Sequence, residues 1–246
     1  MNQEIEKLLL ENGASMVGFA RVEGLYQVVD MEGPRTEDSA TEPFGIPEYP
    51  YGIAIVLAYP KEIIRGICDY PTTEYYEDYH RLSHQLDDLA VKCSQYIRQQ
   101  GFQAHPQLVA ATKEFGIFRT ILPHKTVAVK AGLGWIGKSA LFITEPYGSA
   151  IRLATVLTDA PLDYPKNILQ PKCGSCRLCT EACPGKAISG RNWSQELDRD
   201  DFFDAMACRR KAREISAKVL DKKITLCGKC IEVCPYTKQY TKAVLQ

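Results

Sequence analysis

The sequence lacks any long apolar run and any sign of a cleaved leader. No stretch approaches the ~18 to 20 apolar residues that cross a bilayer, so we expect no membrane span. The N-terminus, MNQEIEKLLLENG, is polar and acidic, which is not typical of a signal peptide. Internal repeats and low-complexity tracts are also missing. We therefore expect a cytoplasmic protein with no membrane partner. The cytoplasm is a reducing compartment, so we expect its thiols to stay reduced.

The chain also lacks net charge, because 30 Lys and Arg balance 30 Asp and Glu. The balance fails locally: residues 172–246 hold 15 basic and 9 acidic residues, a formal charge of +6, whereas residues 1–171 hold 15 and 21. A basic tail can indicate nucleic-acid binding. Two four-iron clusters with eight thiolates would bring about four negative charges, however, and we favour compensation of that charge.

Cysteine is the residue type that the sequence has in excess, with 10 in 246 residues. In a reducing compartment, a dense group of cysteines indicates metal or redox sites rather than disulfides. A chain of this length can form one globular domain and a smaller appended one. The linker PLDYPKNILQP carries three prolines just before the cysteine-rich tail. We predict one domain at residues 1–165 and a second at 166–246.

Alternating helix and strand patterns predict an α/β (α+β) body. EIEKLLLENG is expected to be a helix that ends at Gly13, and apolar spacing predicts a long helix from Thr72 to Gln100. The acidic segment 30–50, rich in Pro and Gly, is expected to be loop. Strands are expected at MVGFARV (16–22), GIAIVLAY (52–59), QLVA (107–110), LFIT (141–144) and AIRLATVLT (150–158), and TVAV (126–129) also fits a strand.

Eight of the cysteines have the spacing of a bacterial two-cluster ferredoxin. Residues 173–184 have the pattern C-x2-C-x2-C-x3-C-P, residues 227–235 have C-x2-C-x3-C-P, and Cys208 lies between the two runs. In such proteins the fourth cysteine of a run ligates the other cluster. We therefore predict two [4Fe-4S] clusters, one held by Cys173, Cys176, Cys179 and Cys234 and the other by Cys183, Cys208, Cys227 and Cys230.

Zinc is the alternative for these cysteines, since eight thiolates could form two tetrahedral zinc sites. The x3-C-P ending of both runs favours iron and sulfur. The 24 residues between Cys183 and Cys208 have a helical pattern, so Cys208 is expected to come from a helix. A free electron carrier rarely needs so large a domain ahead of its clusters, which are expected to feed something bound there. Cys68 and Cys93 are predicted to be core thiols.

The stretch AVKAGLGWIGKSALF (128–142) satisfies two phosphate-binding patterns, G-x-G-x-x-G and G-x-x-x-x-G-K-S. A phosphate site needs a full helix after its glycines, but Pro146 and Gly148 interrupt one early. Trp135 also places bulk where such a loop needs bare backbone. An ATP-dependent iron-sulfur protein stays open as an alternative. We favour glycines that let the backbone approach a flat ligand or a neighbouring element closely.

Together these motifs resemble the epoxyqueuosine reductase family. The likeness runs from about Tyr75 to Pro235 and includes D-Y-H at 78–80, G-L-G-W-x-G-K after Lys-Ala, a strand ending L-T-D-A-P-L, and both cysteine runs. It implies a nitroreductase-like core that holds base-off cobalamin, with an appended ferredoxin domain whose clusters deliver electrons to the cobalt. Family members act on the epoxide of a modified tRNA base, and reductive dehalogenases are their relatives. The corrinoid wall is implied to include Lys130, Gly132, Gly134, Trp135, Gly137 and Lys138.

The chain departs from the family pattern where the family's proton donor stands. Family members place an aspartate about a dozen residues before the Lys-Ala-Gly run, where this sequence has I-F-R-T (117–120), with Glu114 as the nearest carboxylate. Many members also continue into a helical-repeat domain that helps to grip tRNA, and this sequence ends at Gln246. Epoxide opening needs a proton for the developing alkoxide. We predict Tyr79 and His124 as donors; the alternatives are a packed tyrosine and a surface histidine.

Two functions of different classes follow. The first is a cobalamin-dependent, two-cluster oxidoreductase that takes electrons from an external low-potential donor and reduces an electrophilic substrate, either a small molecule or a tRNA-borne group. The second is a non-catalytic two-cluster electron-transfer protein, for example one that reduces the corrinoid of a partner. The coupled GLGWIGK and cysteine patterns support the first function, an enzyme, which we favour. The missing aspartate and the missing repeat domain are the grounds for the second.

Overall fold

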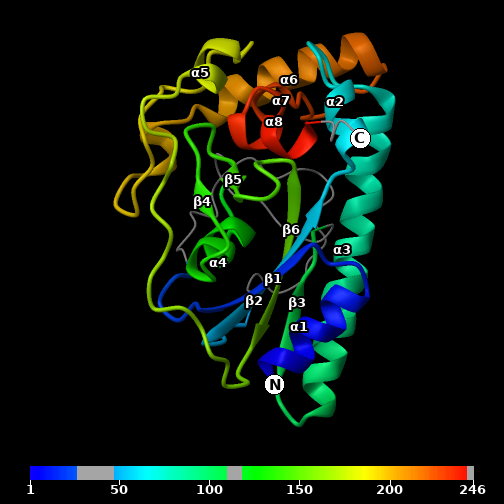
Figure 1. Cartoon of the computed structure of the whole chain (residues 1–246), viewed down its shortest axis with the longest axis vertical. Coiled ribbons are helices and arrows are strands. Elements are labelled where there is room, and N and C mark those ends of the chain that lie inside the picture. The colour runs from blue at the N-terminus through cyan, green and yellow to red at the C-terminus, as the bar shows by residue number, and fades with distance from the viewer. Residues whose placement is uncertain (27–46, 110–117, 243–246) are drawn as a thin grey trace. The chain divides into compact units, whose positions relative to one another are not determined.

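The computed structural model describes residues 1–26, 47–109 and 118–242 (Figure 1). The chain divides into two compact units, each assembled from segments distant in sequence. The predicted continuous division at residue 165 stays a prediction. The first unit comprises Met1–Leu57, Ser83–Leu133 and Leu153–Ile168, and the second comprises Ala58–Leu82, Gly134–Arg152 and Leu169–Gln246.

The first unit is built on a four-stranded sheet with the strand order β1-β2-β6-β3 (Figure 1). Strand β1 (Met16–Arg21) pairs antiparallel with β2 (Tyr51–Ala58), and β3 (Ala104–Gln107) pairs antiparallel with β6 (Ile151–Thr158). The central strand β2 carries nearly continuous apolar sequence and is mostly buried, and the last five residues of its neighbour β6 are also buried, as expected for strands in the middle of a sheet.

Three helices complete the first unit. Helix α1 (Asn2–Glu11) packs against β1 and buries Ile5 and Leu9, and the chain leaves it through Gly13 at φ +99°. Helix α3 (Thr73–Gln99) contributes its part from Ser83 onward, where the predicted apolar stripe is buried. Helix α4 (His124–Lys130) packs against β1.

The predicted strands at TVAV and QLVA are corrected by the structure. TVAV lies inside α4, where Val127, Ala128 and Val129 are buried, so packing overrides the β preference of valine. The strand β3 lies earlier than predicted, at Ala104–Gln107, so only Gln107 of QLVA belongs to it. Residue 110 is outside the described residues. Most of the predicted loop at 30–50 is also outside them. LFIT contributes a two-residue strand.

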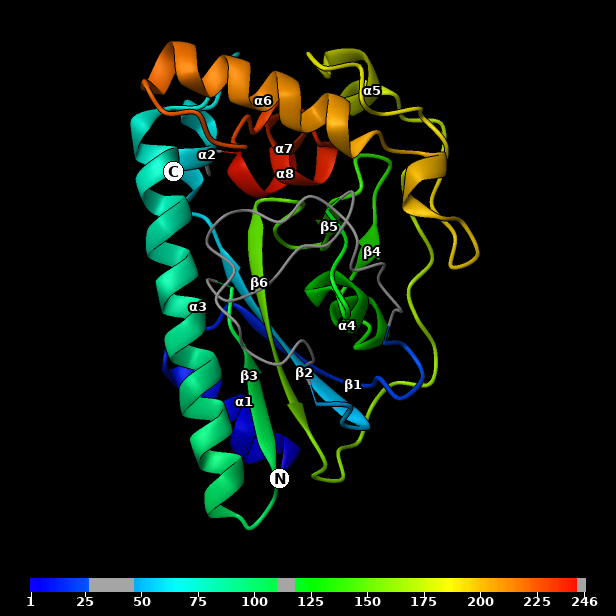
Figure 2. The same ribbon diagram turned by 180° about the vertical axis from the view of Figure 1, so that it is seen from behind.

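The second unit combines α2 (Lys61–Gly66), the first turns of α3 and a short hairpin with the cysteine-rich tail. The hairpin consists of β4 (Trp135–Ile136) and β5 (Phe142–Ile143). Helix α5 packs against α7, α2 packs against α7 and α8, and α6 lies beside α7 and α8 in both views (Figure 2). The tail elements are α5 (Leu178–Ala182), the 3-10 turn η1 (Arg199–Asp201), α6 (Ala205–Leu220), α7 (Lys229–Glu232) and α8 (Pro235–Thr241).

Helix α6 is the predicted helical segment that carries Cys208. The Asp204 side chain caps its first turn by accepting a hydrogen bond from the Ala207 amide, and the helix ends at Asp221 in the left-handed conformation. The capped turn holds Cys208 near the start of the helix. Within the described ranges, no helix is long and apolar enough to cross a membrane.

Candidate iron-sulfur and redox site

The GLGWIGK stretch leads into the β4–β5 hairpin of the second unit. Helix α4 precedes the glycines, the two-residue strand β4 lies between Gly134 and Gly137, and a turn and strand β5 follow Gly137. A phosphate loop needs the opposite order, a strand before the glycines and a helix after them. The ATP-dependent alternative is therefore wrong for this stretch.

Gly134 and Gly137 lie where the chain runs closely against strand β5. A Cβ atom at Gly134 would lie 2.0 Å from the carbonyl oxygen of Ile143, and one at Gly137 would lie 2.4 Å from Ile143 Cδ1. Between them, Trp135 is fully buried and packs edge-on against Tyr236, with ring centroids 5.0 Å apart. These glycines therefore allow the close approach of a neighbouring element, one of the two roles that we expected.

Substitution of Gly134 with alanine is expected to destabilise the protein by about 3 kcal/mol, at the top of the usual range for overpacking. The added methyl group would meet a backbone oxygen, which cannot move aside as a side chain can. The thermal midpoint should fall by roughly 6 to 12 °C. Gly66→Ala is the matched control: its Cβ would meet only Thr72 Cγ2, at 3.9 Å, so the midpoint should not fall. Equal midpoints for the two variants would contradict this account of Gly134.

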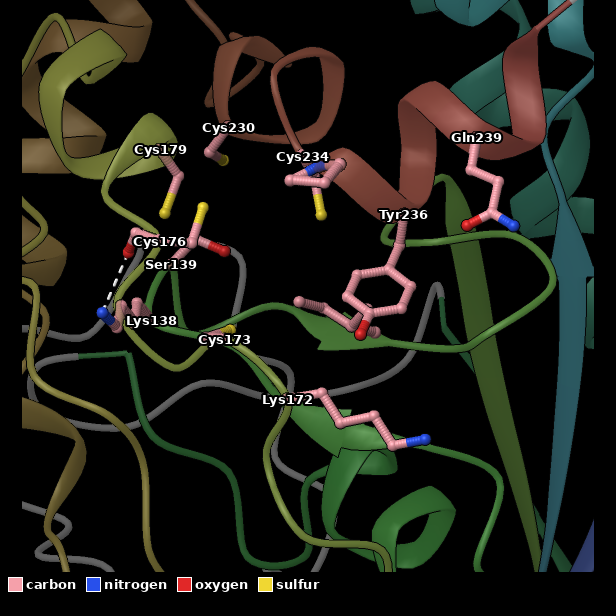
Figure 3. Close-up of a pocket in the computed structure, with 12 residues that line it drawn as sticks. Lys138, Ser139, Lys172, Cys173, Cys176, Cys179, Cys230, Cys234, Tyr236 and Gln239 are labelled. Atoms are coloured by element: carbon pink, nitrogen blue, oxygen red, sulfur yellow. Dashed lines mark hydrogen bonds between the residues drawn. The ribbon is translucent and has the colours of Figure 1, made fainter.

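Lys138 reaches from the hairpin to the first cysteine run. Its side chain is buried, with 5% exposure, and its Nζ donates a hydrogen bond to the carbonyl oxygen of Gly174 at 2.8 Å. A second hydrogen bond, at 2.9 Å, runs to the carbonyl oxygen of Cys176 (Figure 3). Of the predicted corrinoid wall, Lys130 and Gly132 lie in the first unit, and Gly134, Trp135, Gly137 and Lys138 lie in the second. Contact of these six residues with a corrinoid stays a prediction.

A cavity of about 340 Å³ lies beside Lys138 in the second unit (Figure 3). Five cysteines from both runs contribute to its lining, and four of them are the predicted ligands of one cluster. No three His, Cys, Asp or Glu side chains of the described residues converge on one ion site, and the cavity has room for a larger group. Its lining is Lys138, Ser139, Ile143, Lys172, Cys173, Cys176, Cys179, Cys230, Cys234, Pro235, Tyr236 and Gln239.

The first thiol group consists of Cys173, Cys176, Cys179 and Cys234. Burial raises the pKa of the Cys179 thiol, and the other three members of the group raise it further. Burial also raises the pKa of Cys234, although hydrogen bonds from Thr237 and Tyr236 oppose the shift. Cys234, the last cysteine of the second run, therefore lies among the three cysteines of the first run. The raised pKa values indicate that metal binding must displace the thiol protons.

The second thiol group consists of Cys183, Cys208, Cys227 and Cys230. Burial raises the pKa of Cys208 to about 11, and Cys183 and Cys227 contribute to the shift. Desolvation raises the pKa of the partly buried Cys230 thiol well above its usual value, with further contributions from the other three members and from Cys179. The Ala187 amide donates to the Cys183 sulfur at 3.3 Å. These four thiols therefore lie near one another, and their ligation of a second cluster stays a prediction.

Cys68 and Cys93 were both expected in the core, and for Cys68 this prediction is wrong. Cys68 is exposed in the second unit, whereas Cys93 is buried in α3, where burial raises its pKa to about 12. Cys93 lies on the apolar stripe of a helix, but Cys68 follows the short helix α2, where no such stripe fixes its orientation.

Alkylation is expected to distinguish these two thiols. The thiolate is the reactive form of cysteine, and a pKa of about 12 leaves roughly one Cys93 in 10⁴ ionised at pH 8. Iodoacetamide at pH 8 should therefore modify Cys68 within minutes and leave Cys93 intact, as peptide mass spectrometry would show. Cys93 should react once the chain is unfolded in guanidinium. Equal labelling of both thiols in the folded protein would contradict the burial of Cys93.

Tyr79, a predicted proton donor, lies against Arg152 in the second unit. The guanidinium carbon is 3.7 Å from the centroid of the Tyr79 ring. Burial lowers the pKa of Arg152, but interactions with the hydroxyls of Tyr79 and Tyr59 outweigh this effect and raise it. The Nε atom of Arg152 is buried and has no hydrogen-bond partner among the described residues. No motif in the sequence pointed to Arg152, although a lone charge in the predicted strand AIRLATVLT was a usable signal.

A row of aromatic side chains links this pair to the second thiol group. Tyr59 and Tyr75 are buried with ring centroids 5.3 Å apart, and Tyr59 also contacts Arg152. Burial raises the pKa of Tyr75 well above its usual value, and Cys230 contributes to the shift. Tyr79, Arg152, Tyr59 and Tyr75 therefore form a continuous path toward a predicted cluster ligand.

His124, the second predicted donor, lies at the start of α4 in the first unit. Its Nδ1 atom is 2.9 Å from Oγ1 of the buried Thr155, so the ring has a defined orientation. A catalytic role for His124 stays a prediction. At the position of the family aspartate, Ile117 and the nearby Glu114 lie outside the described residues.

Comparison with known families identifies the tail. Residues 172–237 match the family described as "4Fe-4S double cluster binding domain". This range contains both cysteine runs and Cys208. An epoxyqueuosine reductase of Listeria monocytogenes is 35% identical over 119 residues, covering 46% of this chain and 29% of that protein. One from Prochlorococcus marinus is 24% identical over 267 residues, covering 98% of this chain and 79% of that protein. The chain is similar in sequence to both epoxyqueuosine reductases.

Solved structures show the same fold. A selenomethionine-labelled epoxyqueuosine reductase has a TM-score of 0.61 at 21% identity, covering 99% of this chain and 67% of that chain. A catabolic reductive dehalogenase in complex with 3-bromo-4-hydroxybenzoic acid has a TM-score of 0.68 at 21% identity, covering 95% of this chain and 31% of that chain. The predicted α/β (α+β) body with an iron-sulfur domain is confirmed. The chain matches about a third of the length of the first epoxyqueuosine reductases in the comparison.

Proposed function

We propose that this chain is an iron-sulfur, cobalamin-dependent oxidoreductase of the epoxyqueuosine reductase type. The observation that carries the proposal is the cavity in which Cys234 joins Cys173, Cys176 and Cys179. Thiolates from two distant runs around one space of about 340 Å³ suit a cubane cluster shared between the runs. We place the protein in the cytoplasm, where reducing conditions keep its thiols available for metal.

The clusters would be held by the two thiol groups already described. The first would use Cys173, Cys176, Cys179 and Cys234, and the second would use Cys183, Cys208, Cys227 and Cys230. Each group supplies four thiolates, the ligand number of a [4Fe-4S] cluster. The clusters would take electrons one at a time from an external low-potential donor.

The proposal of cobalamin is supported by the relatives. One similar structure is of a reductive dehalogenase described with "a mechanism for B12-dependent dehalogenation". When bound, cobalamin would supply a reduced cobalt that is strongly nucleophilic. The contacts of Gly134, Gly137 and Lys138 are with protein atoms, so they support a structural role for these residues rather than an open cradle.

In the proposed reaction, Tyr79 donates the proton that a developing alkoxide requires. Arg152 lies over the Tyr79 ring, where its positive charge can stabilise the tyrosinate that remains after proton transfer. His124 is kept as a second donor. The substrate would be an electrophile, small or tRNA-borne; one structural relative was solved with an epoxyqueuosine-modified tRNA stem loop.

Anaerobic reconstitution followed by titration with cob(II)alamin tests the proposal. We expect about eight irons and eight sulfides per chain, with an EPR spectrum of cobalt that shifts to the base-off form. An unperturbed cobalt signal at full cluster content would overturn the corrinoid part. Iron well below this value, or zinc in its place, would overturn the cluster part as well.

A non-catalytic electron-transfer protein is the second candidate. The observation in its favour is the sequence I-F-R-T at 117–120, which has no carboxylate where the resemblance implies a proton donor. In that case the clusters would pass electrons to the corrinoid of a partner. Turnover of an epoxide or halogenated aromatic substrate by the isolated chain with titanium(III) citrate would exclude this candidate.

A further inference from the structure

Two lysines line the cavity of the first thiol group, and their environments differ. Lys172 is 45% exposed and forms an ion pair with Glu145. Lys138 is 5% exposed, and both of its hydrogen-bond acceptors are backbone carbonyl oxygens in the first cysteine run. Among the described residues, no carboxylate lies within ion-pair distance of Lys138. The cavity therefore has a buried positive charge that no acidic side chain neutralises.

The second thiol group has a neighbouring lysine whose charge is neutralised. Lys229 precedes Cys230, and its Nζ lies 3.3 Å from Asp69 Oδ1 and 3.2 Å from Glu232 Oε2. A third contact, at 2.6 Å, is to the carbonyl oxygen of Cys68. Two carboxylates thus contact this ammonium, one of them shared with Lys238, in contrast to the neutral acceptors of Lys138. The electrostatic environments of the two groups are therefore unequal.

We propose that Lys138 positions the first cysteine run and raises the reduction potential of the first cluster above that of the second. This inference rests on the proposed cluster ligation. Reduction adds one electron, and hence one negative charge, to a cluster, and a buried cation stabilises that charge because little solvent screens it. The hydrogen bonds to Gly174 and Cys176 also fix the loop that carries three ligands.

The inequality has a functional consequence. At partial reduction, the electron would reside on the first cluster, and the second would be reduced only by a stronger donor. Lys138 would thus set the order in which the two clusters are reduced. The lysine of the GLGWIGK stretch would then serve cluster chemistry, in addition to any contact with a corrinoid.

An EPR-monitored redox titration of the anaerobically reconstituted holoprotein tests the proposal. The Lys138→Met substitution keeps an unbranched side chain but removes the charge and the hydrogen-bond donors. In this variant, the equilibrium constant for one of the two cluster reductions should fall at least tenfold, which lowers the potential of that step. For one electron this shift corresponds to about 59 mV. A Cys208→Ser variant, altered in a ligand of the second cluster only, identifies which step belongs to which cluster. The shifted step should belong to the first cluster.

Lys172→Met is the matched control, because Lys172 lines the same cavity but is exposed and paired. In this variant, the equilibrium constants of both reduction steps should stay within threefold of the wild-type values. Equal shifts in the two variants, or no shift in Lys138→Met at full iron content, would overturn the inference while leaving the proposed function intact. If Lys138→Met loses the first cluster, Lys138→Arg should restore it, and failure to do so would overturn the inference. A wild-type chain without about eight irons would overturn both proposals.

Discussion

Replacement of Cys234 with alanine is expected to reduce the iron content from about eight to about four atoms per chain. The cluster that disappears should be the one bound by the first cysteine run, although Cys234 belongs to the second. The physical reason is that the Cys234 thiol lies with Cys173, Cys176 and Cys179 around one cavity. A cubane that loses one of four thiolates leaves an iron exposed to water and oxygen. Iron analysis and EPR of the reduced protein measure the effect.

Three further variants make this test of the crossed ligation specific. Cys173→Ala should leave the same surviving cluster as Cys234→Ala, with the same EPR spectrum. Cys227→Ala should leave the other cluster. Cys68→Ala is the control, because this exposed thiol is outside both groups, and its iron content should be unchanged. If Cys234→Ala and Cys227→Ala gave the same spectrum, the ligands would be uncrossed, and the assignment would be wrong.

Substitution of Tyr79 with phenylalanine is expected to lower the single-turnover rate constant by about 10² to 10⁴, the usual contribution of general acid catalysis. The ring and its contact with Arg152 would remain, and only the hydroxyl would be lost. Iron content and the cobalt EPR spectrum should be unchanged. Single-turnover reduction of an epoxyqueuosine-modified tRNA stem loop, with titanium(III) citrate as the electron source, is a suitable assay.

Tyr76→Phe provides the matched control for Tyr79. Tyr76 lies on the same turn of α3, where its ring packs against His80 with centroids 4.6 Å apart and beneath Lys222 Nζ at 5.1 Å. Its hydroxyl has no assigned role, so the rate should stay within about twofold of the wild type. A Tyr79→Phe enzyme with the wild-type rate would exclude Tyr79 as the proton donor, and His124→Gln would then be the next variant to measure.

The predicted secondary structure succeeded where local pattern and burial agree. The helix that ends at Gly13 and the long helix over Thr73–Gln99 follow directly from apolar periodicity. TVAV failed because its valines are buried in a helix beside β1, and packing outweighs intrinsic preference over four residues. Cys68 failed for a related reason, since no periodic stripe showed which way its short helix faces.

The sequence by itself determined the iron-sulfur chemistry of this protein. The spacing of three thiolates within one loop is a local property, and residues 172–237, which contain these cysteines, match a double-cluster family. Only the tertiary structure decided that Lys138 hydrogen-bonds to the first cysteine run and that Arg152 lies over the Tyr79 ring. It also decided that position 134 must be glycine, because the backbone of β5 leaves no room for a Cβ atom there. Each of these contacts joins different elements of the chain. Their formation depends on how those elements pack, and no spacing in the sequence encodes that packing.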